Sequence, residues 1–234
     1  MANRFNLNTQ SEAVVDDNLR RYMTSVFGKM FLALCMTGGI SAFMASSPRM
    51  LEMMAGSGSS IILMLATFGI VIYMTARINK ISTETAHILF WTYSAIMGLW
   101  LSPIFVVYTG KSIANCFFVT STFFGGMALL GYTTKRDLTS VGNFMFVGLI
   151  CLIITSFVNI IFFKSGAFQA MLSAISLIIF MGLTAYDIQK IKQFYNVLET
   201  SEISSKRAVL GALSLYMDFL NMFLAVLRLF GDRK

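Results

Sequence analysis

The stretch Leu213-Ser-Leu-Tyr-Met-Asp-Phe-Leu-Asn-Met-Phe223 lies in an apolar segment, residues 208–230, that is long enough to cross a bilayer. A second aspartate, Asp187, lies in Leu183-Thr-Ala-Tyr-Asp-Ile-Gln-Lys-Ile191, within another apolar segment at 167–189. An ionised carboxylate near the bilayer centre costs roughly 2.5–3.5 kcal/mol on insertion scales. The two segments therefore predict membrane-spanning helices that turn Asp187 and Asp218 toward a partner or a water-filled cavity.

The composition of the whole chain agrees with a membrane protein. Of its 234 residues, 56% are hydrophobic and 12% are charged, whereas soluble domains contain about 25% charged residues. The net charge of +7 does not indicate a nucleic-acid partner, because the basic residues are scattered in loop-sized groups, as membrane orientation requires. Cys35, Cys116 and Cys151 all lie in apolar segments, which argues against a disulfide framework or a zinc site.

The apolar segments predict an all-α fold of seven transmembrane helices. Each stretch is near the length of about 20 residues that spans a bilayer; the approximate bounds are 25–46, 59–77, 84–107, 112–133, 140–163, 167–189 and 208–230. On the seventh, small and polar residues recur at steps of three and four: Gly211, Ser214, Asp218, Asn221, Ala225 and Arg228. Such a stripe suits a bundle interior, so we expect six helices around a central seventh. They form one domain over 23–234, after a polar cytoplasmic segment at 1–22.

Lysine and arginine favour the cytoplasmic side of short loops, and they divide unequally here. The N-terminal side holds Arg4, Arg20, Arg21, Lys29, Arg77, Lys80, Lys135, Arg136, Lys190, Lys192, Lys206 and Arg207. The opposite side holds Arg49, Lys111 and Lys164, while Arg228, Arg233 and Lys234 depend on whether the seventh span crosses or re-enters. We predict a cytoplasmic N-terminus and, from the length of the seventh span, a span that crosses.

This topology brings two acids and one base to a similar depth. Asp187 falls in the cytoplasmic third of span six, Asp218 in the middle or cytoplasmic half of span seven, and Arg77 at the cytoplasmic end of span two. Two carboxylates that meet in a dry site cannot both ionise easily, so the pair indicates a proton sensor, a cation site or a proteolytic dyad. Ca²⁺ prefers oxygen ligands, and two carboxylates would bind it weakly. The other polar candidates beside the pair are Asn221, Ser214 and Tyr186.

The same segments resemble a known family. Residues 183–192 and 213–223, followed by Leu227-Arg-Leu-Phe-Gly231, look like the Bax inhibitor-1 family, and residues 98–104 and 131–138 resemble its bacterial branch. The resemblance implies six helices around a seventh and a pH-sensitive calcium leak. In that leak Asp187 and Asp218 would form a hydrogen-bonded pair, and Arg77 would match the latch arginine. Ca²⁺ would be the transported ion, with no resident cofactor. The ending Gly-Asp-Arg-Lys, without the lysine-rich tail of animal members, favours a bacterial inner membrane.

Three functions compete at this point. The first is a passive Ca²⁺ path gated by the pair, because the chain contains no ATP-binding motif and transport would run downhill. The second is an interaction protein that modulates a membrane protease or other membrane machinery, with the polar residues 1–22 as its contact segment. The third, an intramembrane aspartyl protease, is disfavoured because Leu-Tyr-Met precedes Asp218 where those enzymes have Gly-x-Gly. We therefore expect no enzyme.

Overall fold

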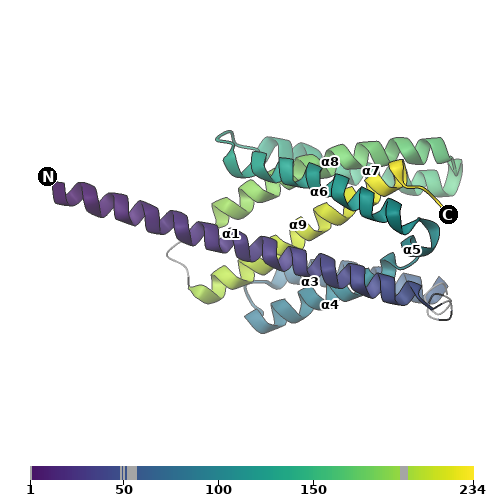
Figure 1. The fold of residues 1–234 in the computed structure, drawn as a ribbon, viewed down its shortest axis with the longest axis horizontal. Coiled ribbons are helices and arrows are strands. Elements are labelled where there is room, and N and C mark those ends of the chain that lie inside the picture. The colour runs from purple at the N-terminus through teal and green to yellow at the C-terminus, as the bar shows by residue number, and fades with distance from the viewer. Residues whose placement is uncertain (1, 48, 50, 52–56, 196–199) are drawn as a thin grey trace.

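The computed structural model describes residues 2–47, 49, 51, 57–195 and 200–234. They form an all-α bundle whose helices follow one another up and down (Figure 1). The elements are α1 (Ala2–Ala45), α3 (Ser57–Arg77), α4 (Thr83–Leu101), α5 (Ile104–Val107), α6 (Gly110–Thr133), α7 (Thr139–Val158), the π-helical η1 (Asn159–Phe163), α8 (Gly166–Phe194) and α9 (Ser201–Phe230). The prediction of an all-α membrane fold is confirmed.

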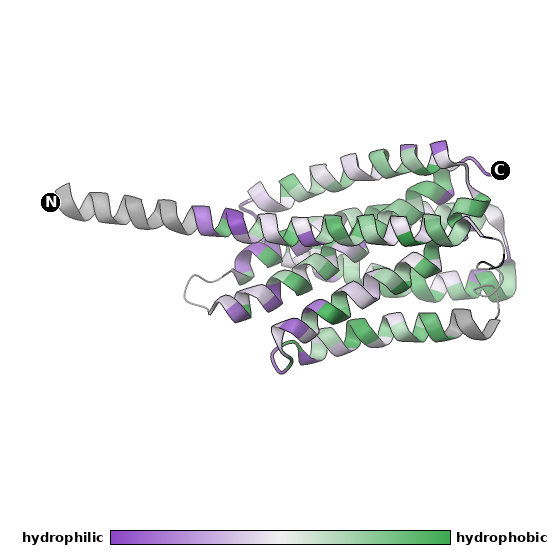
Figure 2. Cartoon of the chain, turned by 60° about the horizontal axis from the view of Figure 1, so that its bottom comes forward, coloured by the Kyte–Doolittle hydropathy of each residue, from purple (hydrophilic) through white to green (hydrophobic). Residues whose placement is uncertain are grey.

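The helices have the length and apolar character that a bilayer requires. Six segments of the described chain are long and apolar enough to cross a membrane: Asp17–Ala45, Thr83–Val107, Gly110–Thr133, Thr139–Phe163, Gly166–Phe194 and Ser201–Phe230. The apolar part of α3 is shorter, Ile62–Arg77. Hydrophobic residues predominate along the middle of the helices, while hydrophilic residues gather near several helix ends (Figure 2). On α7, for example, Gly142 is the one buried residue, and Phe144 is 73% exposed.

Short polar residues start four of the helices. The side chains of Ser82, Thr109, Ser165 and Thr200 each accept a hydrogen bond from a backbone N–H in the first turn of α4, α6, α8 and α9. These N-caps satisfy amide groups that would otherwise lack a partner at the edge of a bilayer. The turn between η1 and α8 is closed by Lys164, whose φ of 48° is left-handed.

Several boundaries differ from the predicted spans for local reasons. The third span is divided at Ser102 and Pro103 into α4 and α5, because proline cannot donate the hydrogen bond that continues a helix. α8 continues to Phe194 and α9 begins at Ser201, so both extend past the apolar stretches into polar sequence. α1 runs without a break from Ala2 through the polar segment 1–22 into the first span, and its beginning projects beyond the bundle (Figure 1).

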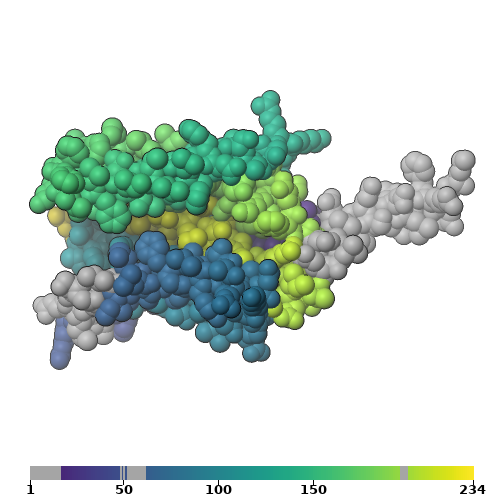
Figure 3. Space-filling model, turned by 180° about the vertical axis from the view of Figure 1, so that it is seen from behind, coloured from purple at the N-terminus to yellow at the C-terminus, as the bar shows by residue number. Residues whose placement is uncertain are grey.

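α9 is the central helix, as predicted. In the described structure it packs against α1, α4, α6 and α8, while α3 packs on α4 and α7 packs on α8 as an outer layer. Figure 1 shows α9 running between α1, α3 and α4 on one side and α6, α7 and α8 on the other, and Figure 3 shows it again in the seam between these halves. Fully buried side chains on α9 include Leu215, Tyr216 and Met222.

The two ends of the bundle are built differently. We call the end where α3, α6 and α8 end and α4, α7 and α9 begin the basic end, and the other the opposite end. α9 is uninterrupted from one to the other, as a span that crosses the membrane requires. At the opposite end the residues after α9 bond to the chain around α5: Thr109 N–H donates to Asp232 O at 3.1 Å, and Lys234 N–H donates to Val107 O at 2.9 Å.

Candidate functional site

Asp218 lies on the central helix, where it is 5% exposed. Its Oδ2 atom is buried and has no hydrogen-bond partner among the residues that the structure describes. A buried polar atom without a partner is costly, more so when it belongs to a charged group. Most of the α9 positions around it are apolar, including the neighbouring Phe219 and Leu220, which are also buried. An ionised carboxylate at Asp218 is therefore energetically unfavourable unless another group or an ion interacts with it.

Asp187 lies on α8, which has the most extensive contact with α9. The side chain of Ser214, one turn before Asp218 on α9, lies beside the Asp187 carboxylate. The carboxylates of Asp187 and Asp218 lie close enough to repel each other when both are ionised. Small residues allow this approach: a Cβ atom on Gly211 would lie 3.1 Å from Ile191 Cδ1. The structure thus brings both aspartates and Ser214 together between two helices.

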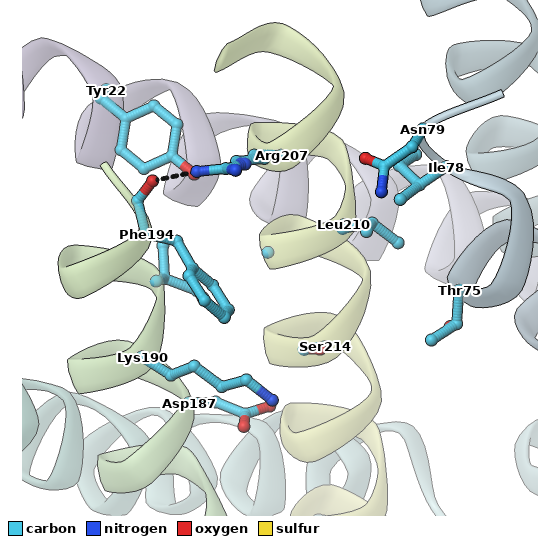
Figure 4. A pocket seen from close by; sticks show the side chains of 12 residues that line it. Tyr22, Thr75, Ile78, Asn79, Asp187, Lys190, Phe194, Arg207, Leu210 and Ser214 are labelled. Carbon is cyan, nitrogen blue, oxygen red and sulfur yellow. Dashed lines mark hydrogen bonds between the residues drawn. The ribbon is translucent and has the colours of Figure 1, made fainter. Parts of the chain in front are cut away.

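A cavity of about 350 Å³ leads from the basic end to Asp187 (Figure 4). Four helices and one turn contribute to its wall: α1 through Tyr22, α3 through Thr75, the turn after α3 through Ile78 and Asn79, α8 through Asp187, Lys190, Ile191 and Phe194, and α9 through Arg207, Leu210, Gly211 and Ser214. The polar groups therefore come from both halves of the bundle. Asp218 is not part of this wall and lies deeper, next to the inner end of the cavity.

A basic side chain lies beside Asp187, the aspartate nearer the mouth of the cavity. Lys190, three residues after Asp187 on α8, attracts it electrostatically, and Figure 4 shows the two side chains next to each other. The Lys190 ammonium also lies 5.4 Å from the ring centre of Tyr186 and 5.8 Å from that of Phe194. Sequence reasoning counted Lys190 only as a topology signal, although the i, i+3 spacing could have identified it as a neighbour of Asp187.

The other residues named from sequence lie elsewhere. Arg77 is exposed at the last position of α3 and is not part of the cavity wall. Tyr186 turns toward α7, where a Cβ on Gly142 would lie 2.4 Å from its ring. Asn221 donates from Nδ2 to the Met217 carbonyl at 2.8 Å, one turn back on its own helix. Of the supporting polar residues, the structure places Ser214 in the site.

The mouth of the cavity is held by contacts between the ends of α8, α9 and α1. Arg207 Nη1 donates to the Phe194 carbonyl at 2.6 Å, and the Arg207 guanidinium lies 5.8 Å from the Phe194 ring centre. The ring centres of Tyr22 and Tyr195 are 5.2 Å apart. These contacts join the beginning of α9 to the end of α8 and bring α1 alongside.

Beyond Asp218, toward the opposite end, the interior is aromatic. The Phe219 ring centre lies 5.3 Å from that of Phe117 and 5.5 Å from that of Phe124, both on α6. Phe117 also faces Phe223, with ring centres 6.4 Å apart. A separate cavity of about 100 Å³ lies past these rings and is lined mainly by apolar side chains. The polar cavity and the opposite end are therefore separated by packed aromatic rings.

The site contains oxygen atoms suited to a hard cation but no dense ligand cluster. In the described chain no group of three or more His, Cys, Asp or Glu side chains could hold a metal ion. Two carboxylates and the Ser214 hydroxyl offer the oxygen donors that Ca²⁺ prefers, in fewer than the six to eight positions of a tight site. The arrangement fits a passing ion better than a bound one.

Comparison with known proteins gives consistent matches over most of the chain. The family model described as "Inhibitor of apoptosis-promoting Bax1" matches residues 19–234. The inner membrane protein YbhL of Escherichia coli K12 is 42% identical over 230 residues, which cover 96% of this chain and 98% of YbhL. Protein RP147 of Rickettsia prowazekii is 42% identical over 226 residues, 97% of this chain and 95% of that protein. A membrane protein of Streptococcus pyogenes serotype M1 is 36% identical over 162 residues, 69% of this chain and 70% of that protein.

Proposed function

The chain belongs to the Bax inhibitor-1 family, and from this premise we propose that it is a pH-sensitive passive Ca²⁺ leak of the bacterial inner membrane. The observation that carries the proposal is a pair of neighbouring carboxylates at the inner end of a cavity in a membrane-spanning bundle. Intramembrane ionisable residues are rare and usually mark an ion or proton path. The role is not enzymatic, and the basic end, with its excess of Lys and Arg, faces the cytoplasm.

Protons set the state of the pair in this proposal. With one proton shared, the carboxylates of Asp187 and Asp218 can hydrogen-bond, which would give Asp218 Oδ2 the partner it lacks. When that proton leaves, two negative charges face each other in a poorly hydrated site and push α8 and α9 apart. The number of bound protons therefore biases the bundle between a closed and an open arrangement.

For an ion path to open, the packed rings of Phe117, Phe219 and Phe223 must move apart. An outer helix must move as well. α3 is suited to move, because in the described chain its extended helix contact is with α4 alone. Its end contributes Thr75 to the cavity wall, and the turn that follows contributes Ile78 and Asn79, so an inward or outward shift of α3 changes access to Asp187. Arg77 is the proposed latch, and an inward shift of the end of α3 is what would bring it to Asp187.

The test is Ca²⁺ flux in proteoliposomes over about pH 5 to about pH 8. Asp187→Asn and Asp218→Asn should each flatten the pH dependence, because each removes one member of the titrating pair. Asp137→Asn is the matched control, since Asp137 is an exposed carboxylate in the α6–α7 loop. Unchanged pH profiles in both site variants would make the aspartates packing residues.

The same assay locates the latch. Arg77→Ala should raise the flux and weaken its pH dependence if the arginine holds the closed state. Lys190→Ala is the competing variant, because Lys190 is the base beside Asp187 in this structure. A change with Lys190→Ala alone would assign the latch to α8.

A second function is favoured by one feature, the projection of α1 beyond the bundle. We infer that this helix could contact a membrane protease or other membrane machinery. Deleting residues 2–16 separates the two functions: Ca²⁺ flux should persist, and regulation of the partner should be lost.

A further inference from the structure

We propose that a cavity beside the α6–α7 loop binds the headgroup of an anionic phospholipid, and that one acyl chain of this lipid lies in a groove between α1 and α6. The headgroup cavity has a volume of about 410 Å³ and lies at the basic end, apart from the Asp187 cavity. Its charged lining residues are Lys135, Arg136, Lys192 and Asp137. Basic pockets between transmembrane helices are suited to anionic headgroups.

The loop that carries two of these bases is held in place before any lipid arrives. The buried side chain of Gln189 accepts a hydrogen bond from Leu138 N–H at 2.8 Å and donates one to the Arg136 carbonyl at 2.8 Å. Lys192 Nζ donates to the Tyr132 carbonyl at 3.1 Å and lies 4.7 Å from the Tyr132 ring centre. α8 thus fixes both sides of the loop, and the cavity needs little reorganisation on binding.

The charged side chains of this cavity differ in whether they already have a hydrogen-bond partner. Lys135 and Arg136 are exposed, and neither side chain makes a hydrogen bond or ion pair with any residue for which the structure gives a position. The one carboxylate, Asp137, is already engaged, because its Oδ1 accepts hydrogen bonds from both the N–H and the hydroxyl of Thr139. The ammonium group of Lys135 and the guanidinium group of Arg136 therefore remain available to a phosphate.

An open groove continues from the headgroup cavity along the bundle. Both α1 and α6 pack on α9, but they make no extended contact with each other. The groove between them is lined by apolar and small residues: Met23, Phe27, Gly125, Ala128, Leu129 and Tyr132, with Arg20 and Thr24 on its α1 side. At Gly125 a Cβ atom would meet nothing within 4 Å, so the groove is unfilled there.

The cavity and the groove are adjacent and lie at the depths a phospholipid requires. Leu19 and Gly131 line the cavity, while the next residues in the chain, Arg20 and Tyr132, line the groove. Gly125 is seven residues from Tyr132 on the same helix, which places it about 10 Å further from the basic end. Basic groups at the helix ends followed by an apolar groove match a phosphate followed by an acyl chain. A phosphate compound without acyl chains would occupy only the headgroup cavity and leave the groove empty.

Native mass spectrometry of the full chain in detergent tests the assignment. Phosphatidylglycerol should bind more tightly than phosphatidylcholine with the same acyl chains. The double variant Lys135→Gln, Arg136→Gln should weaken phosphatidylglycerol binding about tenfold to thirtyfold, because each base near the headgroup contributes about a factor of five. Gly125→Leu, which fills the groove, should weaken both lipids. Glycerol phosphate, a headgroup without chains, should not displace phosphatidylglycerol.

Two controls match these variants. Lys80→Gln removes an exposed base at the same end of the bundle but outside the cavity, and Gly126→Leu adds a side chain at the next position, which is also unobstructed. Neither should change lipid binding. Arg20→Gln, at the mouth of the groove, provides a second charge test if the double variant does not fold. Equal binding of the two lipids, equal losses in Lys80→Gln, or displacement by glycerol phosphate would overturn the proposal.

Discussion

At the scale of single residues, Asp137 is a carboxylate outside the membrane-spanning helices whose behaviour follows from two hydrogen bonds. The Thr139 hydroxyl donates to its Oδ1 at 2.6 Å and the Thr139 N–H donates at 2.9 Å. Both bonds favour the ionised form, the hydroxyl more strongly, and together they lower the pKa of Asp137. Because the folded-state pKa is lowered, this contribution to stability is present above the ordinary aspartate pKa and is lost as the pH falls through the folded value.

Thr139→Val should therefore raise the pKa of Asp137 part of the way back to its ordinary value. Valine keeps the backbone N–H and removes the hydroxyl donor, which is the larger cause of the shift. Carboxyl ¹³C NMR of the detergent-solubilised protein, titrated into the acidic range, measures it. Ser140→Ala, at the neighbouring exposed position, is the control. A pKa that is the same in Thr139→Val and the wild type would contradict the assignment.

The sequence predicted that the two aspartates share a site, but it did not predict all of the side chains around them. Helical spacing correctly places Ser214 and Asp218 on one face of α9, and the structure brings Asp187 to that face. The direction of a side chain on the other helices depends on rotation about each helix axis, which an apolar segment does not reveal. For this reason Tyr186 and Arg77, although close in depth, do not line the cavity.

At the scale of elements, α6 and α8 approach most closely where no side chain intervenes. A Cβ atom on Gly131 would lie 2.2 Å from the Ala185 carbonyl oxygen, which is a backbone atom and cannot rotate away. This contact lies two residues before Asp187, so it also sets where α8 presents that carboxylate. The end of span four could be predicted from its polar loop, but the glycine contact could not, because nothing in the sequence names the partner helix.

Gly131→Ala should destabilise the protein by about 1–3 kcal/mol, the usual cost of forcing extra volume into a packed contact. The thermal midpoint in detergent measures it. Gly126→Ala, on the same helix but with no atom near its Cβ, should leave the midpoint unchanged or raise it slightly. Equal midpoints for the two variants would mean that α6 and α8 can separate at this point without cost.

At the scale of the whole molecule, the sequence identified the central helix from its polar and small stripe, and this prediction is confirmed. It could not show that α9 is buried on nearly every side, including at Leu215, Met222 and Val226. In a membrane protein an apolar face can turn to lipid or to other helices with similar ease. Of the stripe, Arg228 is exposed, because it lies where α9 leaves the bundle.

The uninterrupted α9 makes a topological prediction. Single cysteines introduced as Arg136→Cys and Arg233→Cys, on a background without Cys35, Cys116 and Cys151, should react with an impermeant reagent from opposite sides of the membrane. From the excess of Lys and Arg, we expect position 136 to face the cytoplasm. Intact cells and inside-out vesicles distinguish the two sides. Reaction of both positions from one side would require a break in α9 that the structure does not have.

The central place of α9 has a consequence for biosynthesis. The helices that pack on it, α1, α4, α6 and α8, all precede it in the chain and leave the ribosome first. Until α9 is inserted, α1 and α6 lack the surface on which both are packed, and Thr37 on α1 lacks the Tyr216 hydroxyl, which lies 2.7 Å from it in the finished bundle. α1 and α4 can pack together before α9 is made, as can α6, α7 and α8, but in the described structure these two groups of helices join only through the last helix. A nascent chain arrested before α9 should hold its helices loosely in the bilayer, where quality-control proteases can recognise it.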